Sequence, residues 1–219
     1  MTDAAKKERK PESRWTAFVA IALALVLYFL IPQKVQPIPN WIVPSIGLVM
    51  LIPLFLLNPM RLTKETTWSR WVSISLAILL VLVAQFTIGY TIRELIIGKA
   101  SGPDVLLDVL LIWVTNVIAF SLVYWELDLG GPVARRIEGT RDNRQIDFRF
   151  PQHDGAPGNK FWEPGFIDYA YFSLSNMMAF SPTDVMPMTT RAKLLMGYQA
   201  LTGFILLALV ISRAVNILN

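Results

Sequence analysis

Long apolar runs separated by short polar segments dominate the pattern along the chain. Five of these runs approach the roughly 20 residues that an α-helix needs to cross the ~30 Å hydrocarbon core of a bilayer. They are Trp15–Ile31, Trp41–Leu57, Trp71–Ile92, Val105–Trp125 and Leu194–Ser212. Four of them have a tryptophan at one boundary, the position of an interfacial anchor. The pattern therefore predicts an all-α, polytopic membrane protein with five transmembrane helices.

A sixth apolar stretch, Phe166–Phe180, is too short to span a bilayer as a helix. It follows Pro164, a residue that favours a helix start, and it ends in the polar Ser181-Pro182-Thr183-Asp184 turn. Irregular backbone at membrane depth is tolerated where it is buried in protein or lines a water-filled cavity. We therefore expect a short re-entrant helix and loop before the last span.

These runs divide the chain into three regions. The expected regions are a basic cytoplasmic tail (1–14), a three-helix membrane region (15–103) and a pore-like module (104–219). The pore-like module consists of a span (105–125), a connector (126–163), a re-entrant helix and loop (166–190) and the last span (194–212).

Charge supports the membrane assignment and orients the chain. Only 16% of residues are charged and 54% are hydrophobic, whereas soluble domains carry about 25% charged residues. With the N-terminus in the cytoplasm, sixteen of the twenty lysines and arginines fall on the cytoplasmic side, as the positive-inside rule requires. We expect a multi-pass protein of a bacterial-type inner membrane. Its expected partner is the lipid bilayer, and we do not expect it to bind nucleic acid.

Candidate chemistry is sparse. Cysteine is absent and His153 is the single histidine, which excludes thiolate sites and clusters of histidine ligands within one chain. The connector carries no glycine-rich phosphate loop, catalytic triad spacing or set of metal ligands. We therefore expect no catalytic residues, no metal and no cofactor, and we do not expect an enzyme.

Polar residues inside the spans are few. Gln85 is predicted to hydrogen-bond a neighbouring helix. Asp108, Thr115 and Asn116 lie near one helix face, and two interpretations remain open: a lumen-facing stripe or ordinary helix packing. The second span contains Pro44 and Pro53, for which we favour a kinked packing helix over a re-entrant segment.

The stretch from Tyr171-Phe172-Ser173 to Asp184 and Pro187, followed by an apolar helix, resembles the pore module of the tetrameric potassium-channel superfamily. The resemblance covers residues 105–218. It implies an outer helix, a pore helix, a filter loop and an inner helix, with four copies around a central axis and monovalent cations as the passing species.

The filter positions depart from that family. The filter-like segment, residues 179–184, reads Ala179-Phe180-Ser181-Pro182-Thr183-Asp184 and lacks both filter glycines. A carbonyl filter depends on glycine's access to positive φ, and Pro182 fixes φ near −65°. Hydroxyls of Ser181 and Thr183 with a carboxylate ring of Asp184 would instead favour weakly selective cation passage. Alternatively, Asp184 pairs with Arg191.

Three hypotheses follow. The first is a channel-like homo-oligomer, with a tetramer as the expected assembly. The second is a non-conducting scaffold or accessory subunit that keeps a pore-module fold. The third is a transporter or intramembrane enzyme. Charge places the re-entrant loop on the cytoplasmic side, so the module is either inverted, as in ionotropic glutamate receptors, or one predicted span does not cross.

Overall fold

The computed structural model describes residue 13 and residues 15–57, 66–97, 104–136, 145–154, 162–178 and 185–218. Within these ranges the protein is mostly helical, as predicted. The helices are α1 (Trp15–Leu30), α2 (Ile42–Leu57), α3 (Thr67–Ile96), α4 (Asp104–Leu127), α6 (Phe166–Met177) and α7 (Thr190–Leu218). Two short strands, β1 (Phe148–Arg149) and β2 (Met186–Pro187), form an antiparallel pair.

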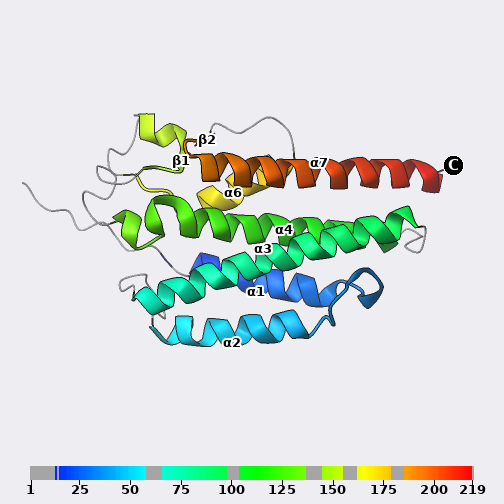
Figure 1. Ribbon diagram of the computed structural model, residues 1–219, viewed down its shortest axis with the longest axis horizontal. Coiled ribbons are helices and arrows are strands. Elements are labelled where there is room, and N and C mark those ends of the chain that lie inside the picture. Colours follow the sequence, from blue (N-terminus) through cyan, green and yellow to red (C-terminus); the bar gives the residue numbers. More distant parts are fainter. Residues whose placement is uncertain are drawn as a thin grey trace, which may run out of the picture.

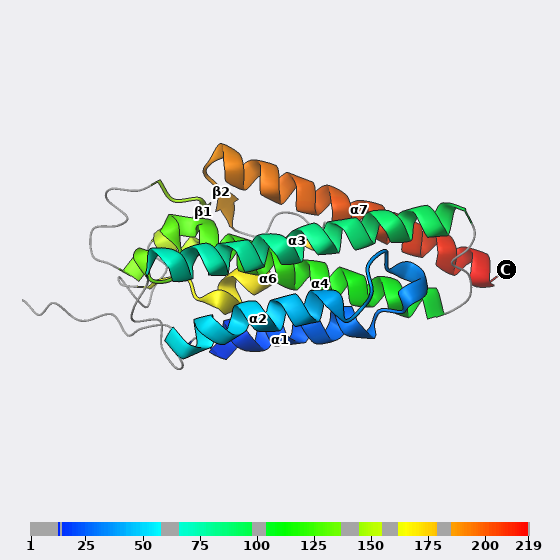
Figure 2. The same cartoon turned by 60° about the horizontal axis from the view of Figure 1, so that its bottom comes forward.

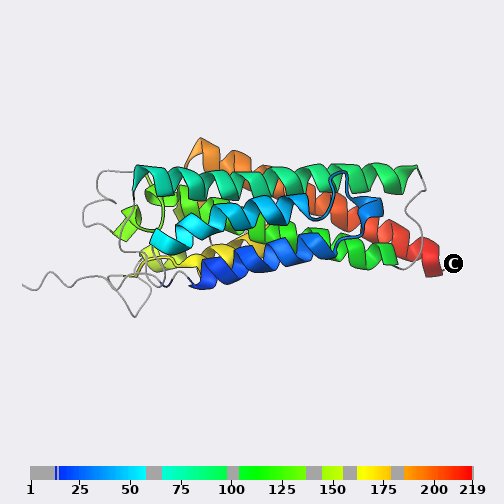
Figure 3. The ribbon, with the colours of Figure 1, turned by 90° about the horizontal axis from the view of Figure 1, so that it is seen from below.

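The helices form an elongated bundle whose members run roughly along its long axis (Figure 1). The long antiparallel pair α3 and α4 occupies the middle, and α1 and α2 pack against this pair on one side. On the other side α6 and α7 pack against α4 and against each other, as the turned views show (Figures 2 and 3). The strands lie at the end of the bundle where α7 begins, and the C-terminus lies at the opposite end (Figure 1).

Helix length separates the predicted spans into two groups. Helices α3, α4 and α7 are long and apolar enough to cross a membrane. Helices α1 and α2 are apolar but have 16 residues each, which corresponds to about 24 Å at 1.5 Å per residue. The membrane-protein prediction thus agrees with three candidate helices, and the prediction of five crossings stays a prediction.

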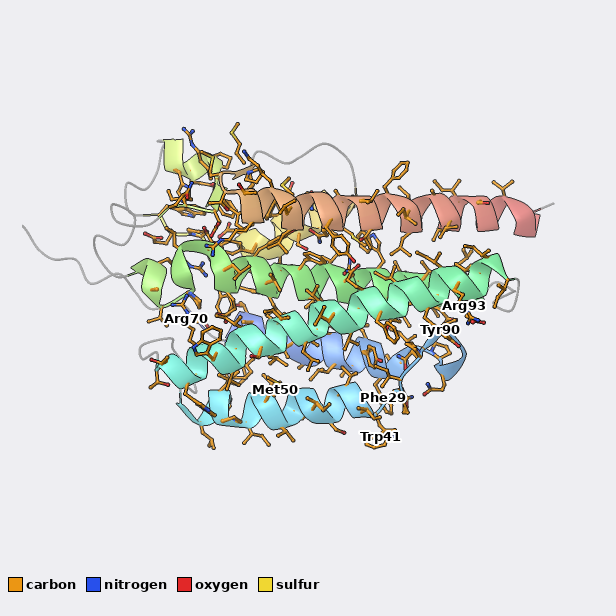
Figure 4. All side chains as sticks on the ribbon, in the orientation of Figure 1. Phe29, Trp41, Met50, Arg70, Tyr90 and Arg93 are labelled. Atoms are coloured by element: carbon orange, nitrogen blue, oxygen red, sulfur yellow. The ribbon has the colours of Figure 1, made fainter. Side chains whose placement is uncertain are left out.

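Basic and aromatic side chains mark the two ends of α3 (Figure 4). Arg70 and Arg93 lie near opposite ends of this helix, separated by about 35 Å of helical rise. Trp41 and Phe29 are exposed and lie toward the same end as Arg93. The separation of the two arginines fits the distance between the interfaces of a ~30 Å hydrocarbon core, and Trp41 lies at one of these two levels.

Helix α2 is a packing helix. It continues through Pro53 without interruption and lies against α1 and α3. At Gly47 a Cβ atom would stand 2.7 Å from the Cδ2 atom of Leu25, so α1 and α2 approach closely there. The packing part of the favoured interpretation is therefore observed, and whether α2 crosses the membrane or re-enters stays a prediction.

Helix α4 ends at Leu127 and is followed by a turn that contains Gly130, Gly131 and Pro132. Leu129, Gly130 and Gly131 have φ angles of 52°, 85° and 101°. Positive φ is readily adopted by glycine, which explains the two glycines at this turn. The turn reverses the chain so that the next residues fold back beneath the end of α4.

Candidate functional site: the short helix α6 and its polar contacts

Helix α6 starts at one end of the bundle and stops midway along α7. Gly203 of α7 faces the end of α6 so closely that a Cβ atom would stand 2.2 Å from the carbonyl oxygen of Met177. The helical rise from Thr190 to Gly203 is about 20 Å. The chain resumes in β2, which pairs with β1 at the end where α7 begins (Figure 1). The segment therefore enters and leaves the bundle at the same end.

The first turn of α6 is fixed by a side-chain cap. Asp168 accepts a hydrogen bond from the backbone N–H of Gly165 through Oδ2 at 2.7 Å. Burial raises the pKa of the Asp168 carboxyl, and bonds from the backbone N–H groups of Gly165 and Asp168 oppose this rise. The structure confirms the capping role expected of an acidic residue at this end of a helix.

One face of α6 is buried between α4 and α7. The buried side chains recur at helical spacing and are Phe166, Tyr169, Phe172, Ser173, Asn176 and Met177. On the opposite face, Ile167 and Tyr171 are exposed. The buried face carries hydroxyl and amide groups, so its neighbours must supply hydrogen-bond partners for them.

Gln199 of α7 is the centre of those partners. Its Oε1 atom accepts from Asn176 Nδ2 at 2.8 Å and from the hydroxyl of Tyr124 on α4 at 2.7 Å. Its Nε2 atom donates to Ser173 Oγ at 2.7 Å, and Ser173 Oγ donates to the carbonyl of Val117 at 2.8 Å. Three helices are joined through one amide, and every group in this chain of bonds is neutral.

A second set of amides lies deeper in the bundle. Gln85 of α3 donates to Asn116 Oδ1 of α4 at 2.6 Å, which confirms the predicted contact of Gln85 with a neighbouring helix. Asn116 Nδ2 donates to the Sδ atom of Met177 at 3.2 Å, and Thr202 Oγ1 of α7 donates to Gln85 Oε1 at 3.4 Å. The end of α6 is thus tied to α3, α4 and α7 without a formal charge.

The predicted site residues have different outcomes. The filter-like segment, Ala179 to Asp184, lies outside the described residues. Asp108, Thr115 and Asn116 are buried within the chain, with 3%, 4% and 0% of their surfaces exposed. Thr115 donates to the carbonyl of Leu111 on its own helix at 2.8 Å. A lumen-facing role for these three stays a prediction.

Arg191, the expected alternative partner of Asp184, binds the carboxylate of Asp147; its pairing with Asp184 lies outside the described residues. Its Nε atom donates to Asp147 Oδ1 at 2.7 Å, and its Nη2 atom contacts Asp147 Oδ2. Asp147 belongs to the connector and directly precedes the strand β1. In this strand Phe148 is buried and Arg149 is exposed.

A buried cation closes the end of α4. Arg135 has 0% of its surface exposed and donates through Nη2 to the carbonyl of Trp125 at 2.9 Å. Its Nη1 atom donates to the hydroxyl of Tyr169 on α6 at 3.1 Å, and its guanidinium lies 4.9 Å from that ring's centroid. Tyr169 in turn donates to Asp128 Oδ2 at 2.5 Å. A cation at a helix C-terminus is favourable, and here it also holds α6.

Some of the contact residues that we did not predict do have a recognisable signal in the sequence. Gln199 is an amide within an apolar span, and such a residue must face protein or water. Arg135 and Asp147, in contrast, lie among alternating charges of the connector, where nothing in the pattern separates buried from exposed groups. In the described part of the chain, no group of three or more histidine, aspartate or glutamate side chains is arranged to hold a metal ion.

Comparisons with protein-family models, with curated proteins and with solved structures gave no match. The resemblance to the potassium-channel pore module therefore rests on the motif in this sequence.

Proposed function

We propose that the protein is a channel-like membrane protein that passes monovalent cations with weak selectivity through a homo-oligomeric, tetrameric pore. In this proposal five helices cross a bacterial-type inner membrane, the N-terminus is cytoplasmic, and α6 is a re-entrant pore helix. Four copies of α6 and the filter-like segment surround the axis.

The observation that carries the proposal is that α6 ends midway along α7. A helix C-terminus has a partial negative charge from its unsatisfied carbonyl groups. Half-helices that end inside the membrane use such termini to attract ions. Helix α6 ends at Met177, about 20 Å along α7. In the proposed tetramer the negative end of its dipole would favour a cation on the axis.

The polar contacts of α6 favour the same function. A pore helix has to be held rigidly, because its end positions the loop that follows. Asn176 is fixed by two acceptors, Gln199 Oε1 and the carbonyl of Met196 at 2.9 Å. The contacts of Asn176, in the last turn of the helix, are neutral, so they place no fixed positive charge there that would repel a passing cation; the charged groups Arg135 and Asp128 contact Tyr169 nearer the start of the helix.

Cation flux from reconstituted protein tests the proposal. We expect liposomes containing the protein to pass K⁺ and Na⁺ at similar rates and to exclude Cl⁻. Asp184→Asn should lower the flux, because it removes the carboxylate ring, whereas Asp184→Glu should retain it. Native mass spectrometry of both variants in nanodiscs should give the same tetramer.

Each other outcome has a distinct meaning. Unchanged flux in Asp184→Asn would remove Asp184 from the mechanism. A tetramer without any flux would favour a non-conducting scaffold or accessory subunit, the alternative motivated by Ser181 and Thr183 at the filter glycine positions. A stable monomer would contradict the central pore.

A further inference from the structure

The strand β2, which leads into α7, pairs with β1 of the connector in a very short ladder. Phe148 pairs with Pro187 and Arg149 with Met186, and the N–H of Met188 donates to the carbonyl of Asp147 at 2.8 Å. A two-stranded ribbon is marginally stable on its own. Other contacts must therefore hold this ladder in place.

The side chain of Asp147 supplies such contacts on the α7 side of the ladder. It is almost fully buried, and it accepts hydrogen bonds from the hydroxyl of Thr189 and from two nitrogens of Arg191. A bidentate arginine–carboxylate pair is among the stronger polar contacts in proteins. Thr189 also caps α7 by accepting from the N–H of Ala192 at 3.2 Å, as its sequence position predicts.

The backbone of the same residue is held from the α6 side. Asp128 Oδ1 accepts from the N–H groups of Asp147 and Phe148 at 3.0 and 3.4 Å. Its other oxygen, Oδ2, accepts from Tyr169 in α6. One continuous set of bonds thus joins the start of α6 to the start of α7 through a residue of the connector.

We propose that Asp147 is a positioning residue that fixes β2 and the start of α7 against the connector. Helix α6 is bonded to the backbone N–H of Asp147 through Tyr169 and Asp128. The start of α7 is bonded to the carboxylate of Asp147 through Thr189 and Arg191. A change that moves Asp147 away from Thr189 and Arg191 would therefore release β2 and the start of α7 from the connector. The effect on ion passage rests on the proposed function, whereas the effect on the ladder does not.

Disulfide trapping measures the ladder directly, because the chain has no cysteine of its own. Arg149 and Met186 are register partners with exposed side chains, and residues directly opposite in such a pair have Cβ atoms about 5 Å apart. The doubly substituted protein, Arg149→Cys with Met186→Cys, should form its disulfide rapidly on mild oxidation. Thiol counting with a maleimide reagent follows the reaction.

Adding Asp147→Asn should slow disulfide formation about tenfold, since hydrogen bonds to a charged group are lost. Arg191→Gln removes the other half of the pair at an exposed side chain and should slow it similarly; this variant serves if Asp147→Asn does not fold. Glu94→Gln, an equally buried carboxylate at the far end of α3, is the matched control and should leave the rate unchanged. Unchanged rates in both Asp147→Asn and Arg191→Gln would overturn the proposal.

Rescue separates positioning from simple destabilisation. In liposomes, Asp147→Asn should lower cation flux severalfold, and closing the introduced disulfide should restore it. Flux that stays low with the disulfide closed, or that never falls, would overturn a role of this ladder in ion passage. If the parent protein passes no ions, the proposed function fails, while the trapping rates still decide whether Asp147 holds the ladder.

Discussion

At the scale of single residues, two glycines of α7 show how differently the same residue type is used. Gly203 is buried against the carbonyl of Met177, where an added Cβ atom would overlap the backbone of α6. Gly197 lies on the exposed side, and a Cβ atom there would have no heavy atom within 4 Å. Because the obstacle at Gly203 is backbone, the neighbour cannot simply rotate away.

We therefore expect Gly203→Ala to lower the free energy of unfolding by about 1–3 kcal/mol, the usual cost of overpacking. Gly197→Ala, the matched control, should be neutral or stabilise by up to about 1 kcal/mol through helix propensity. Unfolding in mixed micelles with increasing SDS measures both. Equal effects of the two substitutions would contradict the close approach of α6 and α7.

At the scale of helices, neutral amides rather than ion pairs join the middle of the bundle. Gln85 and Asn116 connect α3 to α4, and the same pair reaches α6 through Met177 and α7 through Thr202. In a medium of low dielectric such bonds define register, because every alternative leaves a polar group without a partner.

A double-mutant cycle should detect this pair. For Gln85→Leu and Asn116→Leu we expect a coupling energy of about 0.6 kcal/mol, and at most about 1.7 kcal/mol, as for other hydrogen bonds between membrane helices. The cycle of Gln85→Leu with Thr115→Val is the control and should give a value near zero, since Thr115 bonds to its own helix. Equal couplings in the two cycles would show that Gln85 does not act through Asn116.

The sequence predicts an element or a contact well where a single physical effect determines it. Apolar runs located α3, α4 and α7, and the Pro-Gly start with Asp168 located the beginning of α6 at Phe166. The contact of Gln85 followed from the cost of a lone amide in hydrocarbon. The partner of Arg191 did not follow, because Asp147 and Asp184 both suit an arginine by chemistry and only the fold of the connector brings Asp147 to it.

At the scale of the whole molecule, the short helices α1 and α2 decide the topology. If both cross the membrane, the turn between them lies on the side opposite to Ser13. Pro39 is exposed in that turn. The 16-residue lengths of the two helices leave this question to experiment, because each is shorter than a typical span.

Labelling of single cysteines tests the topology in a chain that has none. With intact spheroplasts and an impermeant maleimide, we expect Pro39→Cys to react from outside. Ser13→Cys and Lys64→Cys should react only after permeabilisation. Labelling of Pro39→Cys from the same side as Ser13→Cys would exclude five crossings, and the reverse pattern would invert the orientation.

The placement of α6 also has a consequence for synthesis. Helix α6 has 12 residues, and its partners Gln199 and Gly203 belong to the helix that the ribosome makes after it. During translation the buried face of α6 therefore has no complete docking surface until α7 has been made. We expect docking of α6 to follow the synthesis of α7, so that these two helices assemble against the order of the chain.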